Sequence, residues 1–336
     1  MTATCKHIVT HEPRKQGKTF ALYAAQDPTR TATLRERYAR AMRVRFRELR
    51  GQIRDAVIEK DVLGLSDNSS QVNIQVNADS HLRPRAFDFP RNRDKVSAFM
   101  EWLNRQVDRG ILEVRDRRRI GAAIDQTWQN VFIEDTYKRG VIRANHELRQ
   151  RAFPDVTSLE DRGGIAAVMG QPFHADRLGV LFTRTYNELK GITDAMAQQI
   201  SRVLTQGLAD GDGPRLLGRK LNAVIKGGGG DLGITDALGR YIPAERRAQI
   251  LARTETIRAH HQGMMQEYRN WGVEGVNVQA ELRTAGDGRV CEQCASLEGQ
   301  VFTLAEAQNL IPVHPMCRCI VLPHRPGVDE AKGLNF

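Results

Sequence analysis

The sequence predicts a mainly α-helical protein with a small α+β C-terminal domain. Between residues 31 and 271, apolar side chains recur at intervals of three, four or seven, which is typical of helices that bury one face. Beyond residue 271, short alternating segments and tight turns replace that pattern, and four of the five cysteines lie there. We therefore expect an elongated helical N-terminal part, followed by short strands around a cysteine-rich site.

Changes in composition divide the chain into five regions. The N-terminal arm is basic and contains Pro13 and Gly17, which oppose regular structure, so we expect it to be flexible. Two helical regions follow, and after them come a Cys/His unit with short strands and a loose tail. In that order the regions cover 1–30, 31–170, 171–250, 251–323 and 324–336.

A long helix is expected over 31–63. Its apolar stripe consists of Leu34, Tyr38, Met42, Leu49, Ile53 and Val57. The other faces are rich in arginine, whose planar guanidinium group binds phosphate and carboxylate groups bidentately. The arginines form either a solvated helix face or a contact for DNA or an acidic partner. The candidate contacts are Arg35, Arg40, Arg43, Arg47, Arg50 and Arg54.

The elements up to residue 170 follow from similar patterns. Alternation of apolar and polar residues over 72–76 predicts a short strand. A helix is expected over 92–109, because Gly110 stops it, and a second helix is expected over 116–151. The stretch 154–170 is rich in loop residues.

Glycines punctuate the next region. A helix is expected over 174–208 with a break at Gly191, and the turn-rich residues 207–213 stop it. The run Gly227–Gly230 is not followed by the Gly-Lys-Ser/Thr of a phosphate-binding loop, so we expect a hinge. Another helix is expected over 243–271, with a proline at its start. Short strands are then expected at 276–282, 301–302 and 319–322.

The C-terminal unit contains five candidate metal ligands: Cys291, Cys294, His314, Cys317 and Cys319. Each short pair forms a tight turn that aims two donors at one point, and the loop between the pairs brings the halves together. Structural zinc takes four ligands, so either the four cysteines bind or His314 replaces Cys317 or Cys319. Extended backbone at 317–319 would place both cysteines on one face, which slightly favours the all-cysteine set.

Four protein ligands would leave no position for an activated water, so we expect the zinc to be structural rather than catalytic. The ion would staple a segment that is too small to bury a core of its own. Two alternatives stay open, namely reduced thiols without a metal and a redox pair at Cys291 and Cys294. The redox pair lacks the strand and helix context of thioredoxin-like proteins.

The sequence shows no catalytic constellation, and we expect no enzyme activity. His260 and His261 do not form a His-Glu-x-x-His motif, and no Gly-x-Ser-x-Gly motif occurs.

Charged residues near the cysteines are expected to support the site. Arg253 and Glu255 could place a charged pair beside it, and Asp287 and Arg289 flank Cys291. We expect hydrogen bonds from these residues to hold the turns around the metal, rather than acid–base catalysis.

Several spaced motifs resemble a known family. They are Ala252-Arg253-Thr254-Glu255, Trp271-Gly272, Asp287-x-Arg289-Val290-Cys291-x-x-Cys294, Leu297-x-Gly299 and Pro312-x-His314-Pro315-x-Cys317-Arg318-Cys319. In this order they are similar to the phage Mu F-like minor head proteins, also called the phage head morphogenesis domain. The resemblance is strong over 190–323, and its C-terminal part is the most specific.

The resemblance implies a structural minor head protein of a tailed phage that associates with the portal vertex. It implies roles in head assembly and in DNA packaging, retention or delivery. The expected partners are the portal protein, the major capsid or a scaffolding protein, and DNA, with no membrane. The implied location is the virion head at the portal vertex, and the host cytoplasm during assembly.

Other functions stay open. A zinc-stabilised DNA-binding protein would share the basic charge and the metal site, and its affinity would fall steeply with salt. An enzyme would be a metal-dependent nuclease or a thiol–disulfide catalyst. Domains of this family also occur fused to toxin modules, but no extra domain of convincing size follows residue 323.

Overall fold

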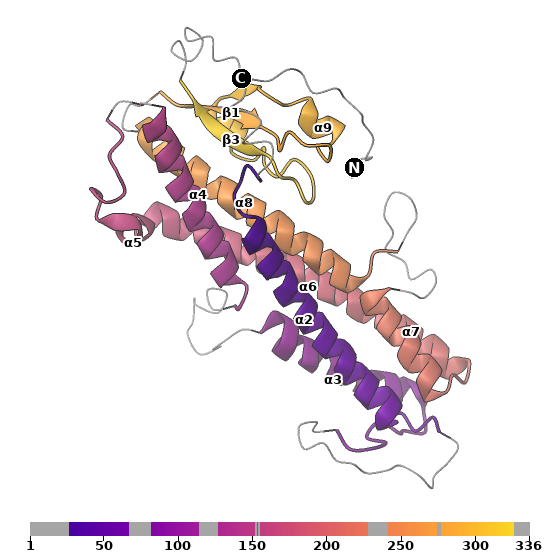
Figure 1. The fold of residues 1–336 in the computed structure, drawn as a ribbon. Coiled ribbons are helices and arrows are strands. Elements are labelled where there is room, and N and C mark those ends of the chain that lie inside the picture. Colours follow the sequence, from indigo (N-terminus) through magenta and orange to yellow (C-terminus); the bar gives the residue numbers. More distant parts are fainter. Residues whose placement is uncertain are drawn as a thin grey trace. The chain divides into compact units, whose positions relative to one another are not determined.

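Helices dominate this protein, and a small sheet near the C-terminus completes it (Figure 1). This arrangement confirms the predicted fold class. The computed structural model describes residues 27–66, 82–113, 127–151, 153, 155–227, 241–273 and 277–325.

The chain divides into two compact units. Unit 1 comprises Met1–Tyr38, Gln129–Thr185 and Ile250–Phe336. Unit 2 comprises Ala39–Trp128 and Tyr186–Gln249. The chain passes between the units four times, once between Trp128 and Gln129 and three times within a long helix. These long helices are α2 (Ala32–Arg54), α6 (Pro172–Ala209) and α8 (Ala244–Val273).

Unit 1 combines helices with the sheet. Besides its parts of the three long helices, it contains α4 (Asn130–Gln150), α5 (Gly164–Met169), α9 (Glu292–Ala295), α10 (Leu304–Ala307) and the strands β1 (Gln279–Arg283), β2 (Val301–Phe302) and β3 (Ile320–His324). The sheet is antiparallel with the order β2-β1-β3. Ala280 pairs with Phe302 on one side, and Leu282 pairs with Val321 on the other.

One hydrophobic core joins the helices of unit 1 to this sheet. It includes Met264, Tyr268 and Trp271 of α8, together with Ala280 and Leu282 of β1. The same core includes the four cysteines of the C-terminal unit. The candidate site therefore lies against the packed interior, which holds its backbone in place.

Unit 2 contains α3 (Asn92–Val107), α7 (Pro214–Lys226) and two π-helical turns, Asp55–Glu59 and Asp108–Leu112. Helix α7 packs on the first of these turns. Gly218 permits the approach, because a Cβ atom there would lie 2.6 Å from Cγ1 of Ile58.

Several predicted elements agree with the structure. The expected helix over 31–63 appears as α2 and the π-helical turn after it, and the expected helices over 92–109 and 243–271 appear as α3 and α8. The strands predicted within 276–282, 301–302 and 319–322 appear as β1, β2 and β3, with ends that differ by a few residues.

Other predictions were wrong. Helix α6 runs without a break through Gly191, because a solvent-facing glycine weakens a helix but does not end it. The helix predicted over 116–151 begins at Asn130 in the described residues, and the loop predicted over 154–170 contains α5. Helix α7 was not predicted, although Pro214 begins it and Gly227 follows it.

Some predictions lie outside the described residues. They concern the arm up to residue 26, the strand at 72–76, the glycines at 228–230 and most of the C-terminal tail.

Candidate metal centre

The five predicted ligands come together in unit 1. Cys291, Cys294 and His314 form one group in which the ligand atoms all lie within 4.8 Å of one another. Cys294, Cys317 and Cys319 form a second such group. Because Cys294 belongs to both groups, the five donors form one continuous cluster.

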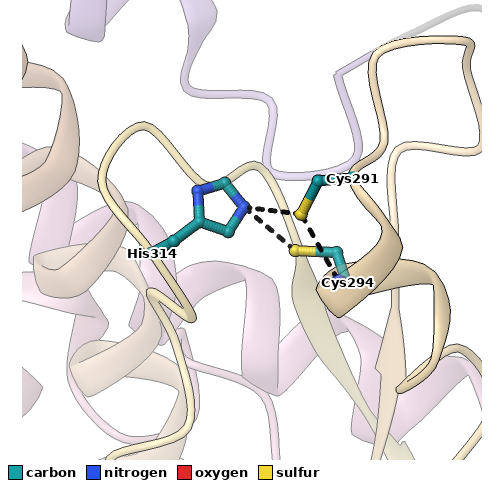
Figure 2. Close-up of side chains that lie close together, drawn as sticks. All are labelled: Cys291, Cys294 and His314. Atoms are coloured by element: carbon teal, nitrogen blue, oxygen red, sulfur yellow. Dashed lines mark hydrogen bonds between the residues drawn. The ribbon is translucent and has the colours of Figure 1, made fainter. Parts of the chain in front are cut away.

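The first cysteine pair is organised by a single helical turn. Cys291 is the N-cap of α9, and its Sγ accepts a hydrogen bond from the backbone N–H of Cys294 at 3.4 Å. An N-cap side chain accepts a hydrogen bond from a free backbone N–H of the first helical turn. The N-terminus of a helix also stabilises negative charge at this position. The Cys-x-x-Cys spacing thus directs both sulfurs to the same side of one turn (Figure 2).

His314 presents a nitrogen to these two sulfurs. Its Nε2 lies 3.3 Å from Sγ of Cys291 and 3.1 Å from Sγ of Cys294 (Figure 2). Its Nδ1 lies 2.8 Å from the carbonyl oxygen of Pro315, which can only accept a hydrogen bond. Nδ1 therefore donates, which leaves Nε2 as the ring nitrogen that could bind a metal.

The second cysteine pair precedes β3. Cys317 is 1% exposed and Cys319 is 3% exposed. The N–H of Cys319 points to Sγ of Cys317 at 3.4 Å, and the N–H of Cys317 bonds to the carbonyl of His314 at 3.1 Å. These hydrogen bonds thus hold the backbone of His314 next to the turn that carries both buried thiols.

Hydrogen bonds among the thiols favour one thiolate. Hydrogen bonding of Cys317 to Cys294 and Cys319 lowers the pKa of Cys317 well below its usual range. Hydrogen bonding to Cys317 and Cys319, together with burial, raises the pKa of Cys294. A soft cation could replace the remaining thiol protons, so this donor set fits a thiolate-binding metal ion.

Asp287 connects the two halves of the site. It accepts two hydrogen bonds from Arg318, at 2.7 and 2.6 Å, and it also binds the side chain of Arg289. The bonds from Arg318 hold the pKa of Asp287 far below its usual range. Arg318 lies between Cys317 and Cys319, so this pair ties the turn before Cys291 to the second cysteine pair.

Of the Arg253-Thr254-Glu255 motif on α8, only Thr254 contacts the loop that carries the ligands, and Arg253 and Glu255 pair with other residues rather than with each other. Arg253 binds Glu36 of α2 at 3.2 and 2.8 Å. Glu255 is 2% exposed and contacts Arg258 at 3.1 Å. Thr254 Oγ1 accepts the N–H of Met316 at 3.0 Å, which anchors the loop between His314 and Cys317.

Two supporting residues were not assigned a role from the sequence. Thr254 and Arg318 both lie inside the quoted motifs, and their spacing next to assigned residues was the available signal. Their partners are distant in the sequence, so only the fold could show which atoms they bind.

The six candidate arginines of α2 separate into two sets. Arg40, Arg47 and Arg54 recur every seven residues and are exposed. Arg35 pairs with Asp27, and Arg50 lies 3.7 Å from Glu245. Arg43 is only partly exposed. Arg40 and Arg47 could meet an external partner without breaking these internal pairs, whereas Arg54 also lies 3.4 Å from the exposed Glu59.

The fold and the site define a helical protein with a small Cys/His unit that could hold a metal ion. Residues 198–322 match the family described as phage Mu protein F like protein, and over this segment the chain is similar to that family. The match confirms the resemblance seen in the motifs and indicates a protein of the phage head morphogenesis type.

The matched segment contains all five candidate ligands, Asp287 and the Arg253-Thr254-Glu255 motif. No curated protein and no solved structure matches the chain. Among the described residues, no helix is both long and apolar enough to cross a membrane.

Proposed function

We propose that this protein is a structural minor head protein of a tailed phage that associates with the portal vertex and supports head assembly and DNA packaging or delivery. The observation that carries the proposal is the family match over 198–322, which spans the whole Cys/His unit and the motifs that support it. The dense internal bonding of this unit suits a permanent structural role.

In this proposal the metal is a structural zinc ion held by four of the five donors. Cysteine thiolates and a neutral imidazole are ligands that zinc prefers. Zinc would supply charge compensation for the thiolates and close the gap between the two halves. The protein supplies the orientation through the Cys291 cap, the His314–Pro315 bond and the Asp287–Arg318 pair.

The portal protein is the first proposed partner, and the major capsid or a scaffolding protein is a further one. Arg40, Arg47 and Arg54 present three cations along one exposed stripe of α2. Such a stripe would complement an acidic surface of the portal.

The test uses phage particles at two stages. Procapsids and virions are purified from a lysate of infected cells, and an antibody to this protein measures its copies in each. We expect the protein in both particles and in a complex with the portal protein after mild dissociation. Absence from both procapsids and virions would refute the head role.

DNA binding is the second candidate function, and the net charge of +10 favours it. It predicts an affinity for duplex DNA that decreases steeply as salt increases. If no binding is detected even at low salt, this candidate is eliminated while the head role stands.

A further inference from the structure

Helix α7 of unit 2 carries basic side chains and no acidic ones. Its sequence, Pro214–Lys226, contains four basic residues and no carboxylate. Helix α2 differs, because glutamates interrupt its arginines.

The apolar side of α7 is buried inside the protein. Its buried apolar residues are Leu217, Leu221, Val224 and Ile225. Tyr241 further fixes the helix, because its hydroxyl donates to the carbonyl of Val224 at 2.5 Å. The helix is therefore held in the unit with its basic side outward, and it has no free apolar face to insert into a membrane.

Three cations share the outer side of α7. Arg215, Arg219 and Lys226 are exposed, and they occupy positions i, i+4 and i+11. At 3.6 residues per turn these positions lie on one stripe, which is about 17 Å long at the helical rise. The stripe is straight and preorganised by the packing beneath it.

The charge of this stripe is not neutralised within the described part of the chain. Lys220, beside the stripe, pairs with Asp212 at 2.5 Å. The described residues provide no ion pair for Arg215, Arg219 or Lys226. The three cations are thus available to an external anion.

We propose that the Arg215–Arg219–Lys226 stripe of α7 binds the phosphate backbone of double-stranded DNA. Phosphates recur about every 3.4 Å of rise along one strand, so a stripe of about 17 Å spans roughly five of them. Contacts by cations to phosphates position a protein without reading the bases. The binding is therefore independent of DNA sequence.

A protein partner fits this face less well than DNA. Protein interfaces depend on clustered aromatic or aliphatic anchors. On the outer side of α7 the only exposed large apolar residue among those described is Leu216, at 41% exposure. A surface of cations without an anchor suits a regular polyanion better.

The inference deepens the proposed head role, since that role brings the protein to packaged DNA, but its test needs no particles. The full-length metal-loaded protein is titrated with a random-sequence duplex at several salt concentrations. The test variant combines Arg215→Gln, Arg219→Gln and Lys226→Gln. The control combines Arg93→Gln, Arg105→Gln and Arg109→Gln, three exposed arginines of unit 2 outside α7.

The stripe variant should lose about three phosphate contacts. The slope of log affinity against log salt should then decrease by about 2.7, and affinity near 0.1 M salt should fall by at least about 100-fold. The control removes the same charge and should change the slope by much less. A second duplex of unrelated sequence should give the same values with each protein.

Three results would overturn the proposal. One is no DNA binding by the unmodified protein at low salt. Another is an equal loss in the stripe and control variants, which would show an effect of net charge alone. The third is an unchanged slope of log DNA affinity against log salt in the stripe variant, together with loss of binding to the portal protein. This result would assign the stripe to an acidic protein.

If the triple variant misfolds, Lys226→Gln alone keeps the test valid. This substitution removes one phosphate contact, so the slope of log affinity against log salt should decrease by about 0.9. Incorporation of these variants into particles is scored separately, so failure of the stripe and failure of the head role give different results.

Discussion

Gly140 of α4 and Gly263 of α8 meet where the two helix backbones touch. A Cβ atom at Gly140 would lie 2.1 Å from the carbonyl oxygen of His260, and one at Gly263 would lie 2.2 Å from that of Tyr137. Each glycine thus makes room for the backbone of the other helix. Since α8 also carries the Arg253-Thr254-Glu255 motif, this crossing positions the support of the metal centre.

Gly263→Ala should destabilise the protein, because the added methyl group forces two backbones apart. We expect a loss of about 1–3 kcal/mol in the free energy of unfolding, measured by denaturant titration. Gly179→Ala is the matched control, since Gly179 lies on α6 of the same unit with nothing within 4 Å of its Cβ position. The control should be neutral or gain up to about 1 kcal/mol. Equal effects of the two substitutions would contradict the close crossing.

Removal of the metal should loosen the C-terminal unit. Purified protein should contain one zinc ion per chain by elemental analysis, and a chelator should lower its melting temperature. Cys294→Ser should abolish metal binding, because Cys294 belongs to both donor groups. Cys5→Ser removes a thiol from the N-terminal arm and should leave the zinc content unchanged. Full zinc content in the Cys294→Ser variant would exclude Cys294 as a ligand.

Arg318→Lys tests the pair with Asp287. Lysine keeps the charge but loses the bidentate geometry, so the two halves of the site should be held less firmly. We expect metal affinity to fall about 10–100-fold, as measured by competition with a chromophoric chelator. Arg289→Lys is the control, because the Arg289 side chain is 75% exposed. An equal fall in both variants would argue against the bridging role of Arg318.

Stability should decrease as the pH falls from about 6.5 to 4. Burial lowers the pKa of His260 to about 3 and that of His261 to about 4, so both rings stay neutral in the folded protein. In this window the unfolded chain binds protons at these histidines and the folded chain does not. Each histidine therefore lowers the free energy of unfolding by up to about 1.4 kcal/mol for each pH unit. Above the pKa that the two histidines have in the unfolded chain, their contribution to the stability of the folded protein is fully present.

Denaturant titrations in the presence of chelator would measure this dependence apart from metal loss. His261→Gln should reduce the slope of the free energy of unfolding against pH, because one proton fewer is bound when the chain unfolds. His146→Gln should not, because His146 is exposed. An identical slope in all three proteins would show that the buried rings do not titrate with unfolding.

The helical part of the fold was predictable wherever one apolar stripe was long. Helices α2, α3 and α8 agree closely with the predicted segments because their period is a local property. Helix α7 was missed because glycine-rich segments surround a short apolar pattern. The break at Gly191 was wrong because a single glycine costs only about 1 kcal/mol, which the rest of a 38-residue helix tolerates.

The sequence by itself determined the donor types and the two tight turns, because spacings of two and three residues set the geometry of a turn locally. Its motifs, in a fixed order, also indicated the family that residues 198–322 match. Only the tertiary structure decided that His314 faces the first cysteine pair, that Asp287 binds Arg318, and which arginines of α2 stay exposed. These relationships join residues far apart in the chain, and they depend on packing that no local pattern encodes.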